Sequence, residues 1–79
     1  MTYFTELKPG QKIRIIKSFR DFDNTEITEG TVLTFLTYDY FPYDGGYTLK
    51  FQESEIRLAE ISKQDHYILE HPWEYIQLV

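Results

Sequence analysis

The chain has 79 residues, a formal net charge of −5 and no cysteine, and 18% of its residues are aromatic. This length fits one domain, 1–79, and the absence of cysteine excludes disulfides, thiolate metal sites and a cysteine nucleophile. An acidic chain repels the phosphates that supply most nonspecific affinity for nucleic acid, and no apolar run approaches the roughly 20 residues of a membrane span. We therefore expect a cytoplasmic protein with no membrane partner, and nucleic acid is disfavoured as a ligand.

The first predicted strand covers 12–19. Ile13 and Ile15 alternate with basic residues, and this period of two is typical of a half-buried strand. Lys17 falls on the apolar side of the pattern, so a bulge or the end of the strand is expected near it. A long polar connection, 20–30, follows.

The second predicted strand, 31–40, is rich in β-branched and aromatic residues. Both of its faces carry apolar side chains, a pattern typical of a central and strongly bent strand. Asp44 and Gly45 then predict a hairpin. The returning strand, 47–52, alternates between apolar and polar residues.

A fourth strand is predicted over 56–61. Ser62 has an acid three residues later, an approximate capping box, so a short helix is expected to begin there. Pro72 ends this helix, because the residue before a proline disfavours helical backbone. The apolar tail 74–79 predicts a fifth strand, and Trp73 is expected to plug one end of the core.

This order of elements resembles an SH3-like small barrel, with a long polar loop after the first strand and an aromatic loop after the second. The chain also resembles short bacterial domains of unknown function that adopt such barrels. The resemblance implies an all-β (mostly β) fold, a five-stranded barrel with one short helix before the last strand, and no particular activity. The segment TYDYFPY, 37–43, superficially resembles the ALYDY stretch of signalling SH3 domains. It follows the second strand here, so no ligand-binding residue is carried over from it.

The segment YDYFPYDGGY, 38–47, holds more rings than a small core can bury. Some of them either face a ligand, which rigid rings grip at low entropic cost, or pack against one another across the hairpin. In an SH3-like layout the loops 20–30 and 40–46 would flank one groove, with aspartates that favour a basic partner. The predicted ligand-binding residues are Phe22, Tyr40, Phe41, Tyr43, Asp21, Asp23 and Asp44.

Other polar clusters fit metal or catalytic chemistry poorly. The run DFDNTE, 21–26, does not supply the glycine and the bidentate glutamate that an EF-hand loop requires. His66 and His71 are five residues apart, whereas offsets of three or four share a helix face. We therefore expect no metal, no cofactor and no catalytic residue, and the protein is not expected to be an enzyme.

The predicted function is that of a small non-catalytic interaction module, which binds a protein segment or peptide through an aromatic groove between two loops. One alternative is nucleic-acid binding through the basic N-terminal strand. The basic residues of that strand and its flanks are Lys8, Lys12, Arg14, Lys17 and Arg20. Another alternative is a homodimer whose seam is the aromatic patch.

Overall fold

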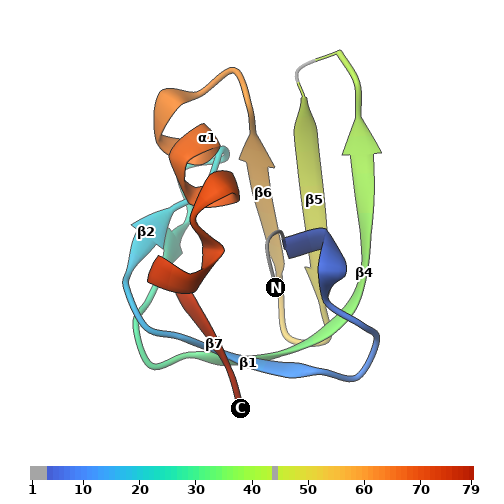
Figure 1. Ribbon diagram of the computed structural model, residues 1–79, viewed down its shortest axis with the longest axis vertical. Coiled ribbons are helices and arrows are strands. Elements are labelled where there is room, and N and C mark those ends of the chain that lie inside the picture. Colours follow the sequence, from blue (N-terminus) through green and yellow to red (C-terminus); the bar gives the residue numbers. More distant parts are fainter. Residues whose placement is uncertain (1–3, 44) are drawn as a thin grey trace.

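The protein is described by a computed structural model that covers residues 4–43 and 45–79 (Figure 1). The strands are β1 (Lys12–Ile15), β2 (Phe19–Arg20), β3 (Glu26–Ile27), β4 (Val32–Phe41), β5 (Gly46–Phe51), β6 (Glu55–Ala59) and β7 (Ile76–Leu78). The helices are the 3-10 turns η1 (Phe4–Glu6) and η2 (Pro72–Glu74) and the α-helix α1 (Lys63–Glu70). Five antiparallel strands form the main sheet in the order β6-β5-β4-β1-β7, and β2 and β3 form a separate hairpin.

The predicted mostly β chain, with one short α-helix before the last strand, is confirmed. The long polar loop after β1 contains the β2–β3 hairpin. Strand pairing does not close the main sheet: β6 and β7 stand at the two ends of the strand order, and no ladder joins them within the described residues. Figure 1 shows β4, β5 and β6 side by side, with α1 next to β6 and with β1 crossing below them. The architecture is therefore a bent, open sheet.

The strand β1 has the alternation that its sequence predicts. Ile13 and Ile15 are fully buried, whereas Lys12 and Arg14 are exposed. The strand ends at Ile15, since continuing the same alternation would bury the charge of Lys17, and a buried unpaired charge is costly. The predicted end of the strand near Lys17 is confirmed.

The strand β4 belongs to both halves of the sheet. Its residues 32–34 pair with β1, and its residues 35–41 pair with β5. The register shifts between Phe35 and Thr37, which is where the strand changes partner. A bulge of this kind bends a strand and increases its twist, so the predicted central, bent strand is confirmed.

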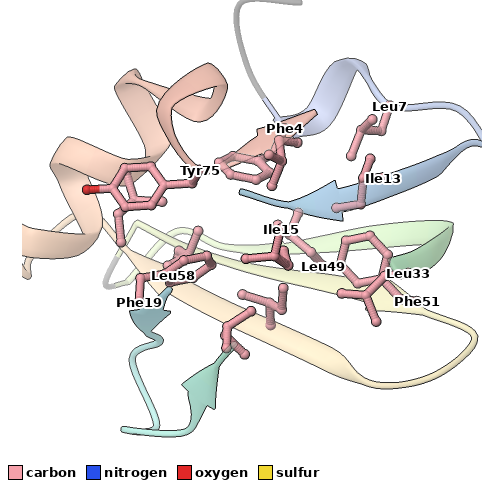
Figure 2. Close-up of a cluster of buried hydrophobic side chains, with 14 of the residues drawn as sticks. Phe4, Leu7, Ile13, Ile15, Phe19, Leu33, Leu49, Phe51, Leu58 and Tyr75 are labelled. Carbon is pink, nitrogen blue, oxygen red and sulfur yellow. The ribbon is translucent and has the colours of Figure 1, made fainter. Parts of the chain in front are cut away.

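The core lies between β1 and the sheet of β4, β5 and β6. Ile13 and Ile15 of β1 belong to the same buried cluster as Leu49 of β5, and all three are labelled in Figure 2. Phe35 and Phe51 meet edge to face, with their ring centroids 5.6 Å apart. Each large apolar side chain buried in this way stabilises the fold by about 1.5–3 kcal/mol relative to exposure.

The expectation that Trp73 plugs one end of the core is wrong. Its side chain lies in η2 and is 45% exposed. Tyr75 is buried instead, and its ring packs edge to face against Phe19 at a centroid distance of 5.4 Å. Pro72 begins a 3-10 turn rather than a loop, and this turn exposes Trp73 and buries the tyrosine two residues later.

The helix α1 begins as predicted. The hydroxyl of Ser62 accepts a hydrogen bond from the backbone N–H of Asp65, at 3.4 Å. The carboxylate of Asp65 is buried and accepts a hydrogen bond from the N–H of Ala59, at 3.1 Å. Ala59 ends β6, which is an edge strand with no neighbouring strand on its outer side. The Asp65 side chain of α1 therefore accepts the hydrogen bond that a neighbouring strand would otherwise accept from the Ala59 N–H.

The buried Asp65 predicts a pH dependence of stability. Burial raises the pKa of this carboxyl above its ordinary value of 3.8; the hydrogen bond from Ala59 opposes the change, and the charge of Asp21 adds to it. A raised pKa in the folded state contributes stability that is fully present below the unfolded pKa and is lost as the pH rises through the folded pKa. Asp65→Asn keeps an acceptor and removes the charge, so its free energy of unfolding, relative to wild type, should rise between pH 3 and pH 7.

Urea unfolding at the two pH values measures this difference. Asp65→Ala is the control: it leaves the Ala59 N–H without an acceptor and should cost about 1–3 kcal/mol at both pH values. A difference between Asp65→Asn and wild type that stays constant with pH would contradict the assignment.

Candidate ligand groove on the outer face of β4, β5 and β6

The outer face of the three-stranded sheet is set by the alternation of side chains along each strand. Asp39 of β4 lies opposite Thr48 of β5, which in turn lies opposite Arg57 of β6. Two residues further along β5, Lys50 lies opposite Glu55 of β6. These side chains all point away from the core and form two parallel rows.

A hollow of about 510 Å³ lies over this face, and we call it the outer groove. Thr48 is its smallest side chain and stands between longer ones on the two neighbouring strands. The residues that line the outer groove are Asp39, Phe41, Tyr43, Thr48, Lys50, Glu55 and Arg57.

Each basic side chain of the outer groove forms an ion pair with a carboxylate. The Nζ of Lys50 lies 2.9 Å from a carboxylate oxygen of Asp39, and Nη1 of Arg57 lies 3.1 Å from a carboxylate oxygen of Asp23. The hydrogen bond to Asp39, followed by the charge of Asp39, raises the pKa of Lys50. Both bases are therefore already in contact with a carboxylate.

Phe22 approaches the outer groove through Arg57. The guanidinium of Arg57 lies over the ring of Phe22, 5.4 Å from its centroid, while Phe22 remains 38% exposed. The backbone N–H of Phe22 donates to the carbonyl of Arg57 at 2.7 Å. Of the predicted binding residues, Phe22 and Asp23 therefore lie beside the hollow that Phe41 and Tyr43 line.

Asp21 has an intramolecular role. It is 7% exposed, and its carboxylate accepts hydrogen bonds from three backbone N–H groups, those of Asp23, Thr25 and Arg57, at 3.0, 2.9 and 3.1 Å. The first two bonds shape the loop, and the third joins it to the open edge of β6. Asp21 thus holds the loop against the sheet, and its oxygens are engaged inside the protein.

The aromatic segment divides between the two faces of the hairpin. Tyr40 lies on the face opposite to the outer groove, where its ring packs against Tyr47 at a centroid distance of 4.9 Å, next to Tyr38. Phe41 and Tyr43 line the groove and are 49% and 100% exposed. The structure thus does not bring Tyr40 together with them, and the predicted residue Asp44 lies outside the described residues.

The groove also contains residues that were not predicted from the sequence. These are Asp39, Thr48, Lys50, Glu55 and Arg57. The alternation of β5 indicated that Thr48 and Lys50 face outward. Their neighbours on β4 and β6 depend on strand register, which local sequence does not specify.

The other clusters of the sequence remain apart from the groove. His66 contacts Glu70 on α1, and the ring of His71 stacks on Tyr67. No group of three or more histidine or acidic side chains is arranged to hold a metal ion within residues 4–43 and 45–79. No helix in this part of the chain has the length and apolar character needed to cross a membrane.

The basic residues of the N-terminal region belong to different elements of the fold. Lys12 and Arg14 lie on the exposed side of β1, and Lys17 lies over the ring of Tyr75, 5.2 Å from its centroid. Arg20 pairs with Glu26 at 3.4 Å. The basic charges are therefore spread over several elements, and the charge of Arg20 is partly neutralised by Glu26.

The chain matches no protein-family model and no curated protein sequence. Among solved structures it is similar to the integron cassette protein VCH_CASS4, from the mobile metagenome of Vibrio cholerae. The two share 30% sequence identity and superpose with a TM-score of 0.84 over 100% of this chain and 92% of the other. The chain belongs to the same family as this bacterial cassette protein. The relative's name describes the origin of its gene and gives no sign of catalysis.

The two aspartates of the loop should differ sharply in their contribution to stability. Asp21→Ala removes the acceptor of three backbone donors and should lower the free energy of unfolding by about 2–4 kcal/mol. Asp23→Ala removes one exposed ion pair and should cost less than about 1 kcal/mol. Urea unfolding of the two variants measures both values, and equal costs would contradict the structural role assigned to Asp21.

Proposed function

We propose that the protein is a small non-catalytic interaction module that binds an extended protein segment in the outer groove. The observation that carries this proposal is the exposure of Phe41 and Tyr43 at one end of the hollow. Exposed rings beside a concave surface are typical of interaction sites, because binding removes their apolar area from water. Tyr43 makes its whole side chain available for such a contact.

The surroundings of these rings support a binding role over a catalytic one. Lys50 and Arg57 in the groove contact carboxylates of the protein itself, so they already have partners within the fold. The groups with shifted pKa values each have a structural partner: Lys50 has Asp39, Glu53 has Thr34, Asp65 has Ala59 and Tyr67 has Glu74. A general acid and base would instead share a pocket.

We further propose that the strand layout is SH3-like. The support is a five-stranded antiparallel sheet with a long loop after the first strand and a 3-10 turn before the last. The cytoplasmic location inferred from the sequence stays a prediction. So does a homodimer, and no observation in the structure favours a self-contact over a foreign partner.

The proposed function predicts the outcome of a capture experiment. Immobilised wild-type protein, incubated with a lysate of the source organism, should retain a partner that the Phe41→Ser/Tyr43→Ser variant does not. Phe41 and Tyr43 line the groove, so their loss removes the apolar contact area of the ligand. Quantitative mass spectrometry of the retained proteins measures the difference.

The matched control is Tyr38→Ser/Tyr40→Ser, which removes two exposed rings from the opposite face of the same strand. This control should retain the partner, and circular dichroism should show that both variants are folded. If both double variants lose the partner equally, or if neither loses it, the groove is not the binding site and the proposal fails.

A further inference from the structure

We propose that the outer groove binds an arginine side chain of its partner segment, between the carboxylate of Asp39 and the ring of Phe41. This inference rests on the proposed function and specifies the chemistry of its ligand. It follows from an arginine site that the protein already contains, from the charge balance of the groove and from a polar group in its floor.

The protein already holds one of its own arginines with a ring and a carboxylate, which the consecutive residues Phe22 and Asp23 supply. The guanidinium of Arg57 lies 5.4 Å from the ring centroid of Phe22 and 3.1 Å from the carboxylate of Asp23. This combination suits arginine, whose planar cation stacks on aromatic faces and pairs with carboxylates.

Asp39 and Phe41 offer the same two groups on the other side of the groove. They are two residues apart on β4, so their side chains leave the strand on the same face, and both line the hollow. The carboxylate of Asp39 is 52% exposed and the side chain of Phe41 is 49% exposed. A ligand guanidinium can therefore reach both groups without displacing the fold.

Among the described residues, the groove and the loop beside it hold one more carboxylate than basic side chains. Asp23, Asp39 and Glu55 face two bases, Lys50 and Arg57. Glu55 has no ion pair within the described residues, and it lies directly opposite Lys50 on the neighbouring strand. Cross-strand neighbours have Cβ atoms about 5 Å apart, so Lys50 can move its ion pair from Asp39 to Glu55. Asp39 is then available to an arriving cation.

The floor of the groove has a polar side chain with no hydrogen-bond partner among the described residues. Thr48 is 7% exposed and lines the hollow next to Asp39, and no hydrogen bond joins its hydroxyl to another side chain or backbone group that the structure describes. Buried polar groups in folded proteins nearly always have a partner. A ligand segment lying over β5 would supply that partner while its arginine contacts Asp39.

The net charge of the whole chain also favours a cationic ligand. A net charge of −5 attracts a cationic segment and repels an acidic one, although Lys50 and Arg57 lie within the groove. An acidic ligand would have to displace the ion pairs of both Lys50 and Arg57, whereas an arginine at Asp39 displaces only the pair between Lys50 and Asp39.

Four synthetic peptides test the inference. Each is a capped peptide of alternating serine and valine, and they differ only at the central residue, which is arginine, lysine, glutamine or glutamate. Each is titrated into ¹⁵N-labelled protein, and the amide shifts of β4, β5 and β6 give the dissociation constant. The arginine peptide should bind at least about fivefold more tightly than the glutamine peptide, and the glutamate peptide should bind most weakly.

Two variants with the same change in net charge identify the receptor. Asp39→Asn should weaken binding of the arginine peptide about tenfold and leave the glutamine peptide unaffected. Glu26→Gln removes a carboxylate that pairs with Arg20 outside the groove and should change neither affinity. The inference is overturned if the arginine peptide does not bind, if glutamine replaces arginine without loss, or if both variants weaken binding equally.

These outcomes are separate from those of the capture experiment. A partner that depends on Phe41 and Tyr43, together with an arginine peptide that does not bind, leaves the proposed function intact and removes the arginine site. A capture that is indifferent to Phe41 and Tyr43 removes the proposed function, whatever the peptides show.

Discussion

The structure depends on one strand that pairs with two different partners. The first residues of β4 pair with β1, the later ones pair with β5, and the register shift between Phe35 and Thr37 separates the two segments. Because the strand bends there, one continuous backbone lines two sides of the core, and Leu33 and Phe35 are both buried within it. The same bend carries the far end of β4 out of the core, where its residues form the outer groove.

Two buried aspartates complete the sheet at its open edge. The N–H groups of Arg57 and Ala59, two residues apart on β6, point away from β5 and donate to Asp21 and Asp65. An edge with unmet donors pairs readily with other chains. Here one carboxylate comes from the loop before β3 and the other from α1, so both elements are tied to the strand that forms one side of the groove. Asp21 and Asp65 are therefore buried where they accept hydrogen bonds from backbone N–H groups at the open edge of β6.

The structure brings together only part of the residue set that the sequence predicted, and the difference has a geometric cause. Phe41, Tyr43, Phe22 and Asp23 do gather around one hollow. Tyr40 is adjacent to Phe41 in sequence but lies on the other face, because successive residues of a strand point in opposite directions and β4 continues to Phe41. The sequence predicted that this strand ends at Tyr40. The alternation of side chains was therefore not extended to Phe41, which the structure includes in β4.

The sequence by itself determined the features that depend on neighbouring residues. The alternation of β1, the cap at Ser62 and the mostly β composition all follow from local spacing and side-chain type. Only the tertiary structure decided that Asp21 is buried, that Trp73 is exposed and that Thr48, Lys50 and Arg57 share a surface with Asp39. These facts depend on strand register and on contacts between segments tens of residues apart, and no local pattern of residues specifies which strands become neighbours.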